Sequence, residues 1–376
     1  MVNERRKPLP ALTGIRIFAA YYVVLLHTGS GYFSRHGAPL LIDNFLGKGY
    51  LAVSLFFVLS GFILAYTYEG KIQGSRNGMH FWEARIARIY PVYLLALAVM
   101  IPFSRDVTFP QRLVVLSMIQ AWIPWRPDLA GAWNFPAWSL SVEAFFYLCF
   151  PVILVVLGRL TAARLRYLAG FLLAIIAVGN LAQPLENWPQ SSLILVRHIP
   201  LPVLRLPEFI VGMSLGLIFL RMPRWKYGGL ISTSMVLLAA AGLCFLTERW
   251  ASVLVAPFAL LILGLAYQHG ILARILSTRI LILFGSASYA VYLLQLPVRI
   301  CTRLLVAKVA HAPHDLDAFL SPVVLLLSSI AVFLLWEEPA RKFLRKVLGL
   351  RARWKWPYLQ PDKPLEKVQV IKSADD

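Results

Sequence analysis

Long apolar runs separated by short polar loops constrain this chain more strongly than any other feature of its sequence. Each run holds about 20 residues, the length that an α-helix needs to cross the hydrocarbon core of a bilayer. A helix satisfies its own backbone hydrogen bonds in lipid, where no water is available. We therefore predict an all-α polytopic membrane protein with about ten transmembrane helices. The predicted spans are residues 11–30, 47–69, 81–103, 139–158, 165–183, 203–221, 228–247, 251–268, 280–299 and 319–337.

The composition agrees with a membrane protein. Apolar residues make up 59% of the 376-residue chain and charged residues only 15%, against about 45–50% and about 25% in an ordinary globular protein. The formal net charge of +19 would suggest nucleic-acid binding in a soluble protein. Here the Lys and Arg residues lie mainly in short loops, where basic residues hold helix ends on the cytoplasmic side. We expect the lipid bilayer as a partner and no nucleic acid.

One apolar segment, residues 110–123, is shorter than the others and is bounded by Pro110 and Pro124. Segments of this length are more often re-entrant or interfacial than membrane-spanning. If it does not cross, ten spans place both termini on one side, together with three basic loops. The positive-inside rule makes that side cytoplasmic, which predicts an integral protein of the plasma (inner) membrane. The three loops carry Arg159, Arg164 and Arg166, then Arg221, Arg224 and Lys226, and finally Arg274 and Arg279.

The charge pattern divides the chain into a membrane-embedded domain, residues 1–340, and a basic cytoplasmic tail, residues 341–376. No second soluble domain is expected, so any chemistry must come from side chains among the helices. The three cysteines, Cys149, Cys244 and Cys301, lie in apolar runs without metal-ligand spacing, and no metal site is predicted. The Gly-x-Ser-x-Gly elbow, the P-loop and the dinucleotide fingerprint are absent from the sequence.

Ionisable side chains inside membrane spans are costly, so each is a candidate for function. Gln295 adds a polar, uncharged side chain within the predicted span 280–299. The ionisable candidates are Arg16, His27, Arg85, Arg88, Glu143 and Glu208.

Arg16 and His27 are eleven residues apart in the first span. Three helical turns separate them, so both project from nearly one face, about 16 Å apart along the axis. The helix would present a cation at one mouth of a cavity and a proton acceptor at the other. Alternatively, Arg16 snorkels to the interface and His27 merely reaches the head groups.

Arg85 and Arg88 are three residues apart and share one helix face at the cytoplasmic end of their span. Paired guanidinium groups suit bidentate recognition of phosphate or carboxylate. The alternative is a pair of positively charged anchors with no ligand.

The predicted topology places His27, Glu143, Glu208 and Gln295 toward the external half of the membrane. A histidine with a carboxylate partner forms a general base, because the carboxylate fixes the tautomer and stabilises the imidazolium. The sequence leaves open whether Glu143 or Glu208 reaches His27. Either carboxylate could instead pair with Arg205 or another arginine as a structural tie.

A series of short motifs runs in order over about residues 10–340. They are Leu12-Thr-Gly-Ile-Arg16 through Leu26-His27, Ser54-Leu-Phe-Phe-Val-Leu-Ser-Gly-Phe62, Arg85-Ile-Ala-Arg-Ile-Tyr-Pro91, Trp138-Ser-Leu-Ser-Val-Glu143, Pro207-Glu-Phe-Ile-Val-Gly212, Gly285-Ser-Ala-Ser-Tyr-Ala-Val-Tyr-Leu-Leu294 and Glu338-Pro339. The ordered set resembles the acyltransferase-3 family of integral membrane acyltransferases. The resemblance implies transfer of an acyl group, usually acetyl from acetyl-CoA, to a hydroxyl of a carbohydrate such as exopolysaccharide or lipopolysaccharide.

The family's Arg-x10-His and Arg-x-x-Arg motifs correspond to Arg16 with His27 and to Arg85 with Arg88. Many relatives have His where this chain has Gln295, which places more of the expected chemistry on His27. We expect Arg16, Arg85 and Arg88 to hold the acyl-CoA phosphates. His27 would deprotonate the acceptor hydroxyl or carry the acyl group, with Glu143 orienting it. Ser139, Ser141 and Tyr289 are candidate oxyanion donors, and Glu208 and Gln295 are candidate substrate contacts.

Two alternatives to this function stay open at the level of the sequence. The acceptor could be a macrolide, a peptide or a lipid head group, since loop sequence does not name a sugar. The chain could instead be a glycolipid or metabolite transporter, with the polar residues lining a path, although no inverted repeat is visible.

Overall fold

Helices form the regular structure of the computed structural model, which describes residues 6–29, 36–37, 39–72, 74–181, 199–222, 226–306 and 316–349. No strand occurs in these ranges. The α-helices are α1 (Pro10–Thr28), α3 (Leu40–Gly47), α4 (Leu51–Tyr68), α5 (Gly74–Met100), α6 (Phe109–Leu116), α7 (Pro127–Ala130), α8 (Trp138–Gly158), α9 (Ala162–Leu181), α10 (Leu201–Arg221), α11 (Gly228–Phe245), α12 (Val255–Ala266), α13 (Gly270–Leu276), α14 (Arg279–Leu305), α15 (Leu316–Val332) and α16 (Glu338–Val347).

Nine helical segments within the described residues are long and apolar enough to cross a membrane. This finding confirms the predicted all-α polytopic membrane protein. The α3–α4 and α15–α16 pairs each count as one segment, because short 3₁₀ or π-helical turns join them without a break. The nine segments are Pro10–Thr28, Leu40–Tyr68, Asn77–Phe103, Phe135–Gly158, Leu201–Arg221, Gly228–Phe245, Glu248–Ala266, Arg279–Leu305 and Ala318–Val347.

The predicted span 165–183 forms α9, which is not among these nine segments. Arg221 at the end of α10 donates hydrogen bonds to the carbonyls of Gly158 and Leu160, just before α9 begins. Near the other end of α9, the Ser252 hydroxyl donates to the Ala177 carbonyl over 3.4 Å. Because α9 is tied to its neighbours near both ends, it runs beside the spanning helices over a similar length.

The short segment 110–123 does not form a spanning helix, in agreement with the prediction. Its helix, α6, has eight residues and is therefore about 12 Å long, less than half the hydrocarbon thickness. The following residues fold against the start of α8, where Gln120 donates to the Ala137 carbonyl over 2.9 Å. The backbone N–H of Ala121 donates to the Ser141 hydroxyl oxygen over 3.3 Å. The segment therefore packs against the N-terminal end of α8.

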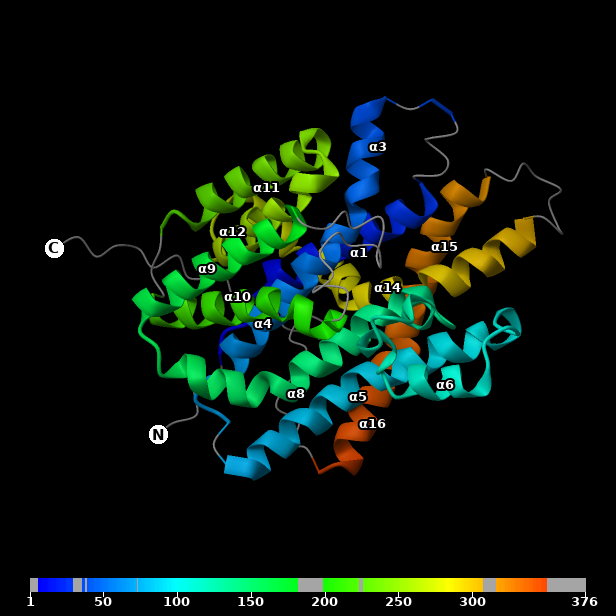
Figure 1. The fold of residues 1–376 in the computed structure, drawn as a ribbon, viewed down its shortest axis with the longest axis horizontal. Helices are drawn as coiled ribbons and strands as arrows, with labels where there is room; N and C mark the ends of the chain where they lie inside the picture. The colour runs from blue at the N-terminus through cyan, green and yellow to red at the C-terminus, as the bar shows by residue number, and fades with distance from the viewer. Residues whose placement is uncertain are drawn as a thin grey trace.

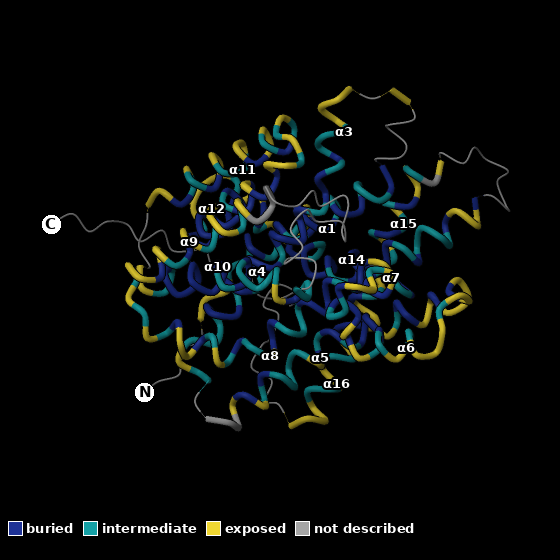
Figure 2. Tube along the Cα trace, in the orientation of Figure 1, coloured by how far each residue is buried: buried dark blue, intermediate teal, exposed yellow. Residues whose placement is uncertain are grey.

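Helices α1, α4, α10 and α14 lie at the centre of the molecule, with α9 and α11 on one side and α15 on the other (Figure 1). Their residues are largely buried, whereas the outer helices expose apolar side chains (Figure 2). Exposed apolar surface on these helices is the surface expected to face lipid. Examples are Phe171 on α9, Leu237 on α11 and Leu327 on α15.

Glycines let the central helices approach one another closely. A Cβ atom added at Gly212 on α10 would lie 1.9 Å from the Val58 carbonyl oxygen of α4. One added at Gly61 on α4 would lie 2.1 Å from the Phe209 carbonyl oxygen of α10. In lipid the hydrophobic effect does not drive helices together, and small residues instead let the helix backbones pack closely at such crossings. The α4–α10 crossing therefore has no room for a side chain at these positions.

Candidate active site

His27 lies in the last turn of α1 and is half-buried. Its Nδ1 lies 3.1 Å from Oε1 of Gln295 on α14. The Phe135 ring meets the imidazole edge-on, with the ring centroids 5.7 Å apart. Arg299, one turn after Gln295, donates a hydrogen bond to the His27 carbonyl. Two helices and the turn before α8 thus fix the position of the imidazole.

The amide of Gln295 determines which imidazole nitrogen carries the proton. Its Nε2 donates to the Tyr292 carbonyl over 2.8 Å, so its Oε1 is the atom that faces His27. An amide oxygen only accepts, so Nδ1 of a neutral imidazole must be the N–H donor. The lone pair is then on Nε2, and His27 is prepared to accept a proton or attack a carbonyl at that atom.

Glu143 has partners other than His27, which corrects the predicted role of this residue. Its Oε1 accepts hydrogen bonds from the Ser60 hydroxyl, over 3.2 Å, and from the Tyr147 hydroxyl. Tyr147 lies four residues further along α8 and therefore on the same helix face. Ser60 comes from the adjoining α4. Gln295, and not Glu143, lies within hydrogen-bond distance of the His27 imidazole.

A group of charged side chains lies around Arg16, nearer the start of α1 than His27. We call the group formed by Arg16, Arg85, Arg88, Glu143 and Glu337 the arginine cluster. Arg16 interacts electrostatically with Arg88, Glu337 and Glu143. The Arg85 guanidinium lies 5.7 Å from the centroid of the Tyr147 ring, whose hydroxyl bonds Glu143. Residues from α1, α5, α8 and the turn before α16 therefore meet in one place.

Arg16 and Arg88 differ from Arg341 in their lack of close partners. Within the described ranges, neither forms a hydrogen bond or an ion pair shorter than 4 Å. Arg341, by contrast, pairs with Glu338. Two guanidinium groups without a close acceptor have their donors available for an anion. The arginine cluster can therefore bind phosphate or carboxylate groups.

Glu337 belongs to the arginine cluster and was not among the predicted site residues. It is fully buried, and neither carboxylate oxygen has a hydrogen-bond partner among the described residues. It interacts electrostatically with Arg88, Arg341 and Arg16. It ends the π-helical turn Phe333–Glu337, and such turns are frequent at functional sites. The available signal was a carboxylate at the end of the predicted span 319–337, beside Glu338-Pro339.

Glu208 forms the structural tie that the sequence left open. Its Oε1 pairs with Arg205 over 3.1 Å, one turn earlier on α10. Arg205 also donates to the Ser54 hydroxyl of α4 over 2.9 Å. Glu208 is 2% exposed, so the pair links two buried helix faces and does not reach His27.

The three predicted oxyanion donors all have partners within the protein. The Ser139 hydroxyl lies 2.8 Å from the Tyr292 hydroxyl and 3.1 Å from the Pro136 carbonyl. The Ser141 oxygen accepts the Ala121 N–H, and the Tyr289 hydroxyl donates to the Ile89 carbonyl over 2.9 Å. These contacts join α8 and α14 to neighbouring segments. The Ser139 and Tyr289 hydroxyls thus donate to oxygens within the protein, whereas the Ser141 hydroxyl oxygen serves as an acceptor.

The described residues contain no group of three or more His, Cys, Asp or Glu side chains placed to hold a metal ion. Cys149, Cys244 and Cys301 are free thiols.

Comparison with known proteins identifies the family. A family model described as an acyltransferase domain, of the type acyltransferase-3, matches residues 9–336. The chain belongs to the acyltransferase-3 family. It is therefore a multi-pass membrane O-acyltransferase, and the transporter alternative is set aside. The matched range contains the His27–Gln295 pair and all of the arginine cluster except Glu337, which follows it directly.

Individual relatives support the same family. Acyltransferase MdmB of Streptomyces mycarofaciens is 32% identical over 350 residues, which are 86% of this chain and 88% of that protein. YrhL of Bacillus subtilis, named as a candidate peptidoglycan O-acetyltransferase, is 24% identical over 79% of this chain and 49% of its own length. O-acetyltransferase OatA of Staphylococcus aureus is 23% identical over 46% of this chain and 29% of its own. No solved structure matches the chain significantly.

Proposed function

We propose that this protein transfers an acyl group, acetyl in the simplest case, from acyl-CoA to a hydroxyl of a cell-surface carbohydrate such as exopolysaccharide or lipopolysaccharide. The observation that carries the proposal is the arrangement along α1. Arg16 and its neighbours form an anion-binding cluster, and His27, about 16 Å further along the same helix face, has a partner that leaves Nε2 unprotonated.

The arginine cluster suits the phosphates of acyl-CoA. Arg16 and Arg88 have no close acceptor within the described residues, and planar guanidinium groups bind phosphate oxygens in pairs. Arg85 is held by aromatic rings on its faces. CoA carries its thioester at the end of a flexible arm, remote from the phosphates. The arm would reach along α1 from the cluster toward His27.

His27 then acts as the general base. Its Nε2 accepts the proton of the acceptor hydroxyl, and the oxygen attacks the thioester carbonyl. The carbon–sulfur bond breaks, and the CoA thiolate takes the proton back from the imidazolium to leave as free CoA. In a two-step variant, Nε2 attacks the thioester first and the CoA thiolate leaves. The hydroxyl oxygen then attacks the acyl-imidazole, the bond from the acyl carbon to Nε2 breaks, and the hydroxyl proton passes to the thiolate. Gln295 serves both routes by holding the proton on Nδ1.

A carbohydrate acceptor is supported by the similarity to YrhL, whose name refers to peptidoglycan. The orientation that we propose follows the basic loops: both termini and the arginine cluster face the cytoplasm of the plasma (inner) membrane, and His27 faces outward. The donor would thus be drawn from the cytoplasm and the acceptor from the outside.

The test compares membranes that contain wild type, His27→Ala or the control His269→Ala at matched protein levels. His269 is an exposed histidine at the start of α13. Radiolabelled acetyl-CoA is the donor and a surface glycan extract is the acceptor. We expect label in glycan with wild type and with His269→Ala, and a loss of at least about 100-fold with His27→Ala. Full activity in His27→Ala would show that His27 is not the base, and a wild type that transfers no label to glycan would show that surface glycan is not the acceptor.

A further inference from the structure

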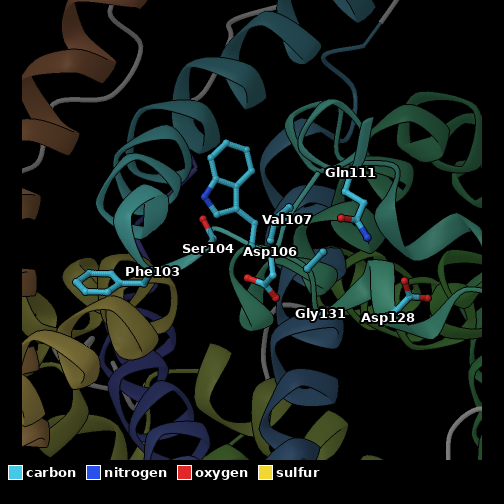
Figure 3. A pocket seen from close by; sticks show the side chains of 9 residues that line it. Phe103, Ser104, Asp106, Val107, Gln111, Asp128 and Gly131 are labelled. Atoms are coloured by element: carbon cyan, nitrogen blue, oxygen red, sulfur yellow. The ribbon is translucent and has the colours of Figure 1, made fainter. Parts of the chain in front are cut away.

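A pocket in the loops that follow α5 contains polar side chains that the same loops already hold (Figure 3). Arg126 donates to both carboxylate oxygens of Asp128. The backbone N–H of Thr108 donates to the side-chain oxygen of Gln111 over 2.8 Å. These two side chains therefore serve the loop itself, whereas α16 carries lysines that are exposed on its surface.

The last spanning segment is longer than the core of the membrane. Residues Ala318–Val347 make up 30 residues, which as a helix measure about 45 Å, whereas the hydrocarbon core is about 30 Å thick. The final ten residues form α16, and they include four basic side chains and one acidic side chain. Because charged side chains are costly in hydrocarbon, α16 lies at the level of the lipid head groups.

Contacts with the rest of the protein determine which face of α16 points outward. Arg341 donates to Glu338 one turn earlier, and its side chain is only 12% exposed. Trp336, in the turn just before α16, donates its Nε1 hydrogen to the Pro91 carbonyl of α5 over 2.8 Å. Helix α16 lies beside α5 at the edge of the molecule (Figure 1). Glu338 and Arg341 therefore face the protein, and the opposite side of α16 faces away from it.

The outer face of α16 carries an apolar stripe next to a basic one. Phe343 and Val347 are four residues apart, and each is 65% exposed. Lys342 and Lys346 are also four residues apart, so they form a second stripe that adjoins the first around the helix. The Lys342 side chain is 74% exposed, although its Nζ lies 3.5 Å from Glu338, and Lys346 is exposed as well. Both ammonium groups can therefore reach an anion outside the protein.

An anionic phospholipid matches both stripes of this face. Its acyl chains suit Phe343 and Val347, and its negatively charged head group suits the two lysines. Free phosphate would leave the apolar stripe without a partner, and a zwitterionic lipid carries a cation that offsets its own phosphate. Amphipathic helices with a basic face bind membranes through this combination of contacts, and basic residues next to a membrane span attract anionic lipids.

We propose that the outer face of α16 is a binding site for an anionic phospholipid. Lys342 and Lys346 contact its head-group phosphate, and Phe343 and Val347 lie among its acyl chains. In the orientation proposed above, this lipid belongs to the cytoplasmic leaflet. The inference does not depend on the proposed acyl transfer.

The test uses the full-length protein in phosphatidylcholine nanodiscs with a small amount of photoactivatable phosphatidylglycerol or photoactivatable phosphatidylcholine. After illumination, the protein is digested with a protease that does not cut at Lys or Arg, and mass spectrometry measures the lipid attached to α16. In wild type we expect phosphatidylglycerol to label α16 at least about tenfold more than phosphatidylcholine, since each lysine contributes about fivefold at an anionic surface. In Lys342→Gln/Lys346→Gln this ratio should fall below about threefold.

Two further variants serve as controls. Arg164→Gln/Arg166→Gln removes two exposed arginines of α9, on the same side of the membrane in the proposed orientation, and should keep the wild-type ratio. Lys342→Arg/Lys346→Arg keeps the charge and should also keep it. Equal labelling of wild-type α16 by the two lipids, or a ratio unchanged in Lys342→Gln/Lys346→Gln, would overturn the proposal. An equal fall in the α9 variant would also overturn it, because the preference would then reflect overall charge.

Discussion

At the scale of single residues, the His27–Gln295 contact determines where the chemistry starts. Replacing Gln295 with Leu removes the oxygen that holds the proton on Nδ1 and leaves the side-chain volume similar. We expect kcat to fall by about 10- to 100-fold, as for other groups that orient a reacting side chain, with little change in KM for acetyl-CoA. Because Gln295 acts through His27, adding Gln295→Leu to His27→Ala should cause no further loss. A further loss of the same size would show that Gln295 contacts substrate directly.

Arg88 carries a second prediction at this scale. Arg88 has no close partner among the described residues. Arg88→Gln therefore removes a proposed phosphate contact and breaks no hydrogen bond or ion pair with those residues. We expect KM for acetyl-CoA to rise about tenfold or more, while the KM for glycan stays constant. Arg166→Gln is the control, because Arg166 is an exposed arginine on α9. Equal effects of the two substitutions on the KM for acetyl-CoA would show that Arg88 contributes only to the general positive charge and makes no specific phosphate contact.

At the scale of elements, the α4–α10 crossing sets the relative positions of Ser60 and Arg205 and hence of their carboxylate partners. Gly212→Ala would place a Cβ atom 1.9 Å from a backbone oxygen. Overpacking of this kind costs about 1–3 kcal/mol, and we expect a Tm several degrees below that of wild type in detergent. Gly170→Ala on α9, where a Cβ atom meets nothing within 4 Å, should leave Tm unchanged or slightly raised. A wild-type Tm for Gly212→Ala would contradict the tight crossing.

At the scale of the whole molecule, the sequence predicted the spans well because each needs an uninterrupted apolar run. The predicted spans 203–221 and 228–247 correspond to α10 and α11 within two residues at each end. The partner of Glu143 was not predictable in this way. Periodicity fixes the face on which Glu143 and Tyr147 lie, but the packing of α4 against α8 decides that Ser60 meets them. Glu337 was missed for the same reason, since its interaction partners Arg16 and Arg88 are far away in the chain.

We propose that acyl-CoA binds near Arg16 and that the acceptor binds near His27, at the other end of α1. The side of the membrane from which each substrate is taken therefore tests this arrangement most directly. Purified protein is reconstituted in one orientation into liposomes, and labelled acetyl-CoA and surface glycan are supplied on chosen faces. We predict transfer when acetyl-CoA is on the face of the termini and glycan is on the opposite face, and none with the two exchanged. Transfer that needs both substrates on one face would contradict a donor site and an acceptor site at opposite ends of α1.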